Sequence, residues 1–276
     1  MKNNITPHLI NWKFLVLLLS ITFSLSFVSY FFYSKPLHKE SITVQSVYLK
    51  TPKDIRVLTN PVHAIIYQNS VDLNSLPVAQ KKLHFIAMVL PSILLAKAEH
   101  QTLQNKVHAW LTKKPETIKE KLEVKKLLKQ FKVNSLSLLY NALYTPPTSL
   151  ILAQSIIESG WGTSRFFREA NNIFGIWSYN KNEKRLQASQ MRGDKAIYVR
   201  AYDSIDSSIK DYLTTLSRSY AFAQLREQSV ITDDPYELCC YLEHYSERRI
   251  EYVKELAIIL TYNNLIQYDS YTLSQE

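Results

Sequence analysis

The sequence predicts a mainly α-helical domain with a small β-hairpin lobe, preceded by one transmembrane helix near the N-terminus. Three observations carry this prediction. Apolar residues recur at spacings of three and four from Gln80 onward, which is typical of amphipathic helices. Residues 176–202 are polar and end in an alternating run that is typical of a strand. Residues 14–33 carry no charge at all.

The uncharged segment, residues 14–33, is long enough to span a bilayer as a helix. A cleaved signal peptide is the rival interpretation, but its apolar region is normally shorter and is followed by a small-x-small cleavage site, which is lacking here. We therefore expect residues 1–11 to be a cytoplasmic tail and residues 12–33 an uncleaved anchor. Lysines on both sides balance the flanking charge, so the short tail is the reason to place the larger C-terminal part outside.

The segment after the anchor, residues 34–79, has a mixed composition with four prolines. Apolar and polar residues alternate around Ser41–Tyr48 and Ile55–Ile66, which favours short strands. We expect a stem or linker that carries two such strands and leads into the folded domain.

Residues 80–140 are predicted to form the helical N-terminal part of the domain, and residues 141–270 its core. Pro91 is expected to kink the first helix or to start a new one, because proline clashes with the preceding turn. Thr148 or Ser149 is expected to cap the helix that follows the Pro-Pro pair. Further helices are expected at residues 116–132, 135–143, 150–158, 163–169, 204–218, 235–245 and 247–264.

The chain has a formal net charge of +9, which favours anionic membrane or wall surfaces as partners or serves solubility alone. No nucleic-acid partner is expected, because the lysines are spread along the chain without a nucleic-acid-binding motif. The two cysteines, Cys239 and Cys240, are adjacent and give no disulfide framework. The seven histidines show no metal-binding spacing, so we expect neither a metal site nor a cofactor. The oligomeric state is left open.

Glycine is clustered in one part of the chain. Three of the four glycines, Gly160, Gly162 and Gly175, fall within sixteen residues, beside Trp161 and Trp177. Glycine permits backbone angles that other residues resist. A chain that otherwise avoids glycine is therefore expected to need special backbone geometry here.

Glu158 ends the apolar helix that leads into this glycine cluster. Burial disfavours a charged carboxylate, and the partial negative charge at the end of a helix acts in the same direction, so both raise its pKa. Such a group can donate a proton to a glycosidic oxygen. The alternative is a structural glutamate that caps the helix or pairs with Arg165 or Arg168.

The wider sequence favours the catalytic interpretation. The run ILAQSIIESGWGTSRF at residues 151–166, followed by NNIFGIW at 171–177, resembles the glucosaminidase domain of glycoside hydrolase family 73. Three further matches follow in order: VRAYDS at 199–204, SSIKDY at 207–212 and YSER at 245–248.

The Pro-Pro entry and the helical region from Lys81 look most like the Bax-like subgroup of that family, bacterial proteins with an N-terminal membrane segment. The resemblance covers about residues 80–270 and is strongest over 145–178. It implies a lysozyme-like α+β fold around the helical core.

The resemblance also implies roles for single residues. Glu158 matches the family's general acid, and Tyr245 matches a tyrosine that lines the cleft. Trp177 is expected either to stack on a sugar ring or to pack in the core. Gln154, one turn before Glu158 on the same side of the helix, and Tyr202 are further candidates for substrate binding.

A second catalytic carboxylate is expected in the hairpin, where the sequence offers Glu183 and Asp194. Neither stands in a recognisable motif, and Glu183 also fits a solvated turn. Assistance by the substrate's 2-acetamido group, or the single-acid route of lytic transglycosylases, would make a second carboxylate unnecessary. Retaining and inverting outcomes stay open, because they depend on the separation of two carboxylates.

The sequence thus predicts a peptidoglycan hydrolase of the endo-β-N-acetylglucosaminidase type, which cleaves β-1,4 bonds in glycan strands by acid catalysis from Glu158. It would be held in the bacterial inner membrane by its N-terminal helix, with the catalytic domain facing the periplasm. The alternatives are a lytic transglycosylase and a non-catalytic protein that binds the wall with the same fold.

Overall fold

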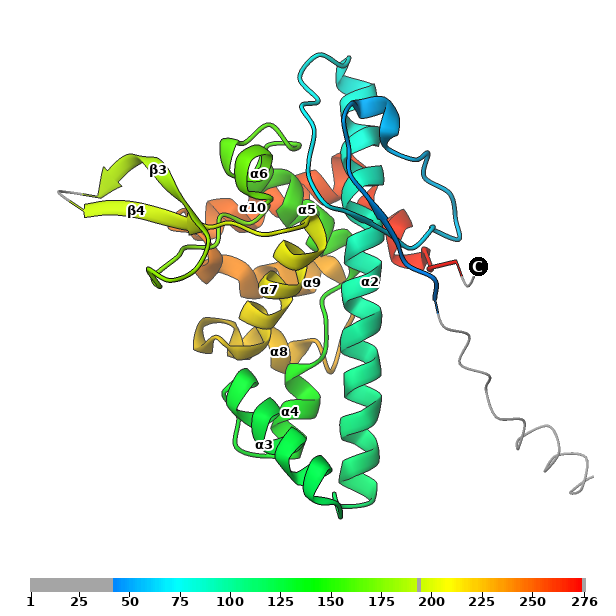
Figure 1. Cartoon of the computed structure of the whole chain (residues 1–276), viewed down its shortest axis with the longest axis vertical. Helices are drawn as coiled ribbons and strands as arrows, with labels where there is room; N and C mark the ends of the chain where they lie inside the picture. The colour runs from blue at the N-terminus through cyan, green and yellow to red at the C-terminus, as the bar shows by residue number, and fades with distance from the viewer. Residues whose placement is uncertain (1–41, 193–194, 275–276) are drawn as a thin grey trace, which may run out of the picture. The chain divides into compact units, whose positions relative to one another are not determined.

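The structure is a computed structural model that describes residues 42–192 and 195–274 (Figure 1). The expected tail and membrane anchor, residues 1–11 and 12–33, lie outside the described residues, and so does the candidate carboxylate Asp194. The described chain is mainly helical with a two-stranded antiparallel hairpin and a second, smaller pair of strands. The predicted helical domain with a β-hairpin is therefore confirmed.

The elements follow the expected order along the chain. The helices are α2 (Val78–Thr112), α3 (Ile118–Phe131), α4 (Leu136–Ala142), α5 (Thr148–Ser159), α6 (Arg165–Ala170), α7 (Ile205–Arg218), α8 (Ala223–Gln228), α9 (Pro235–Cys239) and α10 (Ile250–Tyr262). Short 3-10 helices are η1 (Pro52–Asp54), η2 (Tyr220–Phe222), η3 (Cys240–Tyr245) and η4 (Leu265–Ser270). The strands are β1 (Gln45–Val47), β2 (Ile65–Tyr67), β3 (Arg185–Arg192) and β4 (Lys195–Arg200).

The long helix α2 is continuous through Pro91, so the expectation of a new helix at that point is wrong. Every residue from Phe85 to Ala96 is buried. Packing on all sides of this stretch offsets the cost of an internal proline, which is about 3 kcal/mol. By length and composition α2 could also span a membrane, but 61% of its apolar 18-residue stretch is buried within the domain. In this fold it is the central core helix.

Residues 42–77 form part of the domain core, which corrects the expectation of a separate stem. Strand β1 pairs in parallel with β2, and β2 packs against α2 and α7. Leu49, Tyr67 and Leu73 are each no more than 1% exposed and belong to the main hydrophobic cluster. The alternating pattern did mark two strands, but their apolar faces are covered by the helical domain.

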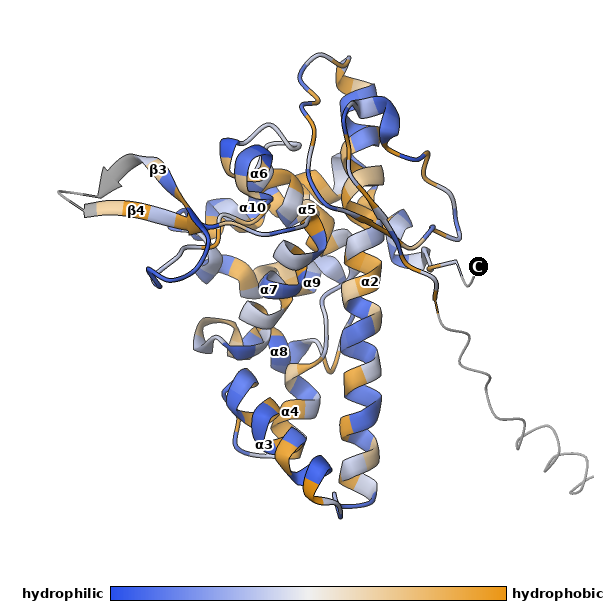
Figure 2. Ribbon diagram, viewed as in Figure 1, coloured by the Kyte–Doolittle hydropathy of each residue, from blue (hydrophilic) through white to orange (hydrophobic). Residues whose placement is uncertain are grey.

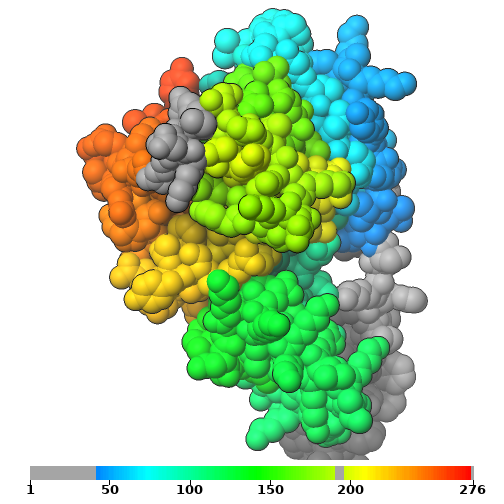
Figure 3. Space-filling view, turned by 60° about the vertical axis from the view of Figure 1, so that its left-hand side comes forward, coloured from blue at the N-terminus to red at the C-terminus, as the bar shows by residue number. Residues whose placement is uncertain are grey.

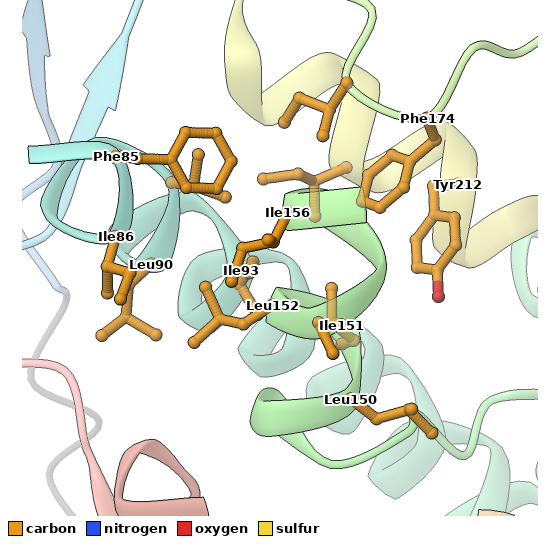
Figure 4. Packing of buried hydrophobic residues seen from close by; sticks show 14 of the residues in the cluster. Phe85, Ile86, Leu90, Ile93, Leu150, Ile151, Leu152, Ile156, Phe174 and Tyr212 are labelled. Carbon is orange, nitrogen blue, oxygen red and sulfur yellow. The ribbon is translucent and has the colours of Figure 1, made fainter. Parts of the chain in front are cut away.

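Helix α5 runs through the middle of the core. Its residues from Thr148 to Ile156 are all buried. Figure 4 shows its apolar side chains between those of α2, such as Phe85 and Ile93, and the pair Phe174 and Tyr212. Packing on all sides restricts the motion of this helix, so a functional group at its C-terminal end has a fixed position.

The N-terminal end of α5 is capped from a distance. We expected Thr148 or Ser149 to cap it, but Pro147 is the N-cap residue and makes no side-chain cap. Instead, the Asp269 carboxylate of η4 accepts hydrogen bonds from the Ser149 backbone N–H at 2.8 Å and from its hydroxyl at 2.7 Å. A carboxylate satisfies free N–H groups at this end of a helix and suits its partial positive charge.

The second half of α2, with α3 and α4, has a hydrophobic cluster of its own. We call this part, residues 97–143, the arm. The buried residues of its hydrophobic cluster are Val107, Trp110, Leu127, Phe131, Leu139 and Leu143. Figure 3 shows α3 and α4, in green, as a lobe beside the rest of the described domain. Along α3, hydrophilic and hydrophobic residues alternate in the helical pattern (Figure 2).

Candidate active site

The turn after α5 has the unusual backbone geometry that the glycine cluster predicts. Gly160 caps the helix in the left-handed conformation with φ +58°, and Gly162 follows with φ +80°. A side chain at Gly162 would bring its Cβ to 3.0 Å from the ring of Phe85. The Ser159 hydroxyl accepts a hydrogen bond from the Gly162 N–H at 3.0 Å. These contacts fix the helix end one residue beyond Glu158.

Glu158 is half-buried at this helix end. Burial is the main cause that raises the pKa of its carboxyl above the ordinary value of 4.5. A hydrogen bond from Tyr252 and the charge of Arg248 oppose this rise, and the charge of Glu255 adds to it. The result is a carboxyl group that holds its proton to higher pH than an exposed glutamate does.

Three tyrosines lie near Glu158, and two of them are hydrogen-bonded to one glutamine. The Tyr212 hydroxyl donates to Gln154 Oε1, and Gln154 Nε2 donates to the Tyr252 hydroxyl at 3.1 Å. The Tyr245 and Tyr252 rings are stacked at 5.6 Å between centroids. Because Tyr252 accepts from Gln154, its own proton is available to Glu158. Burial, and next the charge of Glu158, raise the pKa of all three phenols, so they stay neutral donors.

Gln154 does not face the cleft, which corrects its expected role in substrate binding. Its side chain is fully buried, and both ends of its amide are engaged by Tyr212 and Tyr252. It positions Tyr252, which in turn contacts Glu158. Sequence reasoning missed both tyrosines as site residues. The available signal was Gln154 itself, because a buried amide on an apolar helix needs polar partners.

An open cleft of about 480 Å³ lies in front of Glu158. Its walls come from the end of α5, residues 174–179, β4, the last turn of α7 and η3. Arg200 and Arg218 bring positive charge to the wall, and Glu158 is the one carboxylate among the described residues that line it. The cleft therefore has two positive side chains that can bind anionic groups of a polar ligand, and one acidic side chain beside them.

Trp177 and Tyr245 both line this cleft. Trp177 is 39% exposed and tilts toward Tyr179, with ring centroids 6.1 Å apart, so it lies in the cleft wall and not in the core. It also borders an adjoining hollow between α6 and the β3–β4 hairpin. The Tyr245 hydroxyl donates to the Phe174 carbonyl at 3.3 Å, which ties η3 to the opposite wall.

Glu183 and Tyr202 lie around Arg200 and not along the cleft. Arg200 pairs with Asp211 at 2.6 Å and with Glu183 at 3.5 Å. The Tyr202 hydroxyl donates to the same Asp211 carboxylate at 2.7 Å. Both residues thus hold Arg200 in the wall, and this corrects the expectation that Tyr202 binds substrate directly. Within residues 42–192 and 195–274, no group of three His, Cys, Asp or Glu side chains is arranged to hold a metal ion.

Comparison with known proteins gives this geometry a context. Residues 136–265 match the family model described as mannosyl-glycoprotein endo-beta-N-acetylglucosaminidase. The chain is 27% identical over 179 residues to protein bax of Escherichia coli (strain K12), covering 58% of this chain and 62% of that protein. It is also 27% identical over 136 residues to the exo-glucosaminidase LytG of Bacillus subtilis (strain 168), covering 46% and 47%. The chain thus spans less than two thirds of the length of these curated relatives.

Solved structures with a similar chain include the catalytic domain of the autolysin Auto from Listeria monocytogenes. It has 21% identity and a TM-score of 0.37, and the match covers 60% of this chain and 96% of that one. A peptidoglycan hydrolase from Sphingomonas sp. A1 has 22% identity and a TM-score of 0.38, with 51% and 86% covered. Glu158, its tyrosines and the cleft all lie within the residues that the family model matches. Over residues 136–265, therefore, this chain is similar to the glucosaminidase family.

Proposed function

We propose that this protein is a glycoside hydrolase that cleaves β-1,4 bonds next to N-acetylglucosamine in peptidoglycan glycan strands. The observation that carries the proposal is Glu158, a carboxyl group at the end of a buried helix, with its pKa raised by burial, at the edge of an open cleft. The glucosaminidase family domain and the similarity to an exo-glucosaminidase support the substrate class.

In this proposal Glu158 donates its proton to the glycosidic oxygen as the bond to the leaving sugar breaks. The hydrogen bond from Tyr252 stabilises the carboxylate that remains and orients it. Trp177 offers an exposed ring on which the apolar face of a sugar can stack, and Tyr245 closes the opposite wall. The hydrogen bond from Gln154 keeps Tyr252 in place.

Which residue supplies a second catalytic carboxylate is a separate proposal. The ion pair with Arg200 occupies Glu183. Asp194 is the remaining candidate from the hairpin sequence, and we propose it as the first residue to test for the role of base or nucleophile. Loss of turnover in Asp194→Asn with a native fold, and a smaller loss in Glu183→Gln, is the expected result.

Peptidoglycan lies outside the cytoplasmic membrane, so we propose that the domain acts there. The uncharged sequence at residues 14–33 is the proposed anchor in the bacterial inner membrane, with the catalytic domain in the periplasm. Peptidoglycan is the proposed partner of the cleft, and the membrane that of the N-terminal segment.

The test is digestion of purified peptidoglycan by the full chain, followed by mass spectrometry of the fragments. Fragments with N-acetylglucosamine at new reducing ends are expected. Anhydro-sugar ends would mean that the protein catalyses the transglycosylase reaction and not hydrolysis. Binding without any fragments would mean a wall-binding protein, and would overturn the proposed activity.

A further inference from the structure

The arm carries a dense positive charge. Residues 113–132 contain eight lysines and three glutamates, which gives a net charge of +5 out of +9 for the whole chain. These residues cover the tip of the arm and all of α3. More than half of the excess charge is thus placed on one short segment, which ends just before residues 136–265 that match the family model.

The glutamates of this segment do not neutralise the lysines of α3. Glu123 pairs with Lys106 of α2 at 2.5 Å, and Glu116 pairs with Lys113 before the helix begins. Glu120 accepts hydrogen bonds from the Thr117 N–H and hydroxyl in the capping box at the start of α3. Among the described residues, no carboxylate lies within ion-pair distance of the α3 lysines (Lys119, Lys121, Lys125, Lys126, Lys129 and Lys132).

These lysines share an outward face with two apolar side chains. The sequence positions 118, 122, 125, 129 and 132 follow helical spacing and form one stripe, which we call the α3 stripe: Ile118, Leu122, Lys125, Lys129 and Lys132. All five residues are exposed, Ile118 by 79% and Leu122 by 62%. Lys121 flanks the stripe and is exposed as well.

The orientation of the stripe is fixed by the opposite side of α3. Leu127 and Phe131 are buried there in the arm cluster with Trp110 of α2. A helix held by this apolar face cannot turn its stripe inward. The stripe is therefore a standing surface feature in which apolar side chains lie among uncompensated positive charges.

We propose that the α3 stripe binds the surface of an anionic lipid bilayer, so that the arm holds the domain against the membrane. Lysines near an anionic bilayer raise the partition coefficient by about fivefold each, through attraction to the lipid headgroups. Helices that lie in the bilayer interface combine such lysines with apolar side chains that enter the headgroup region. Ile118 and Leu122 fit that position, whereas an anionic wall polymer would engage the lysines alone.

The proposal is tested on the full chain reconstituted in vesicles of phosphatidylcholine, with or without phosphatidylglycerol. A short pulse of lysine acetylation is read by mass spectrometry, lysine by lysine. Reactivity of Lys121, Lys125 and Lys129 is expected to fall about fivefold or more in the anionic vesicles and to recover in high salt. Lys53 and Lys181, which are exposed elsewhere, serve as internal references. Equal reactivity in both kinds of vesicle would overturn the proposal.

A matched pair of variants tests the apolar part. Leu122→Gln is expected to restore a good part of the lysine reactivity in anionic vesicles. Leu83→Gln, at a residue of α2 that is 63% exposed outside the arm, is expected to leave the protection unchanged. Full protection in Leu122→Gln, or protection by isolated peptidoglycan but not by vesicles, would overturn a lipid partner. Glu158→Gln should keep the protection, so failure of the proposed activity and failure of this inference are distinguishable.

Discussion

At the scale of single residues, the surroundings of Glu158 are set by a chain of contacts, in which Gln154 holds Tyr252 and Tyr252 contacts Glu158. Gln154 lies on the same helix but never faces the cleft, because its amide bridges Tyr212 and Tyr252. Tyr252 then donates to Glu158 and opposes the rise in pKa that burial causes. The pKa of the Glu158 carboxyl is therefore raised mainly by burial and lowered first by Tyr252, with smaller opposing effects from the charges of Arg248 and Glu255.

Tyr252→Phe should move the pH dependence of cleavage. The phenol stabilises the carboxylate form of Glu158, so its removal raises the pKa of the acid further. A general acid works while protonated, and activity is lost as pH rises through its pKa, so the alkaline limb of the pH–rate profile should move to higher pH. Tyr245→Phe is the control, because its hydroxyl bonds to the Phe174 carbonyl. A shift to lower pH in Tyr252→Phe, or an equal shift in both variants, would contradict this balance.

At the scale of elements, the turn between α5 and α6 fixes the end of the helix that carries Glu158. Its glycines have positive φ angles, and the turn is packed against α2 through Phe85. The glycine cluster predicted special geometry from the sequence, but the contact with Phe85 could not be predicted. That contact joins residues far apart in the chain, and only the packed fold brings them together.

Gly162→Ala should lower the free energy of unfolding more than Gly175→Ala does. Both glycines have positive φ, which costs a non-glycine residue about 1 kcal/mol. At Gly162 the new methyl group must also displace Phe85 from 3.0 Å, for about 1–3 kcal/mol more, whereas nothing lies within 4 Å at Gly175. Denaturant unfolding of the two variants provides the comparison. Equal losses would mean that the Phe85 contact does not constrain the turn.

The sequence predicted elements better than it predicted their surroundings. Helical periodicity located α3, α5, α7 and α10 to within three residues, because local spacing decides which face is apolar. The expected new helix at Pro91 is wrong, and so are the expected cap of α5 and the expected stem at residues 42–77. In each case long-range packing, such as the Asp269 cap from η4, overrides a local preference.

For the site, the family-like motif named Glu158, Trp177 and Tyr245, and the structure places all three at one cleft. The supporting tyrosines and the ion pairs of Arg200 could be identified only from the structure, because these residues come from α7, α10 and the hairpin. Spacing in the sequence says nothing about which of eighteen tyrosines meets a given carboxylate.

At the scale of the whole described domain, two separate hydrophobic clusters support different parts of the structure. The main cluster surrounds α5 and supports the cleft, and the arm cluster holds α3 and α4 against the second half of α2. Because the clusters share no buried residue, damage to one should spread little to the other. The arm can then serve binding while the body serves chemistry.

Leu139→Ala should weaken the arm alone. Leu139 is fully buried in the arm cluster, and its truncation should cost about 2–5 kcal/mol through lost contacts and the cavity left behind. Hydrogen exchange measured by mass spectrometry should speed up in α3 and α4, with α5 unchanged. Equally faster exchange in α5 would show that the arm and the body unfold as one unit.

The most direct test of the central claim compares wild type and Glu158→Gln on purified peptidoglycan. Glutamine keeps the shape of the side chain but has no acidic proton to transfer, so release of glycan fragments should be abolished. Circular dichroism and thermal unfolding of the variant should match those of wild type. Fragment release at the wild-type rate by a folded Glu158→Gln variant would contradict the assignment of Glu158 as the catalytic acid.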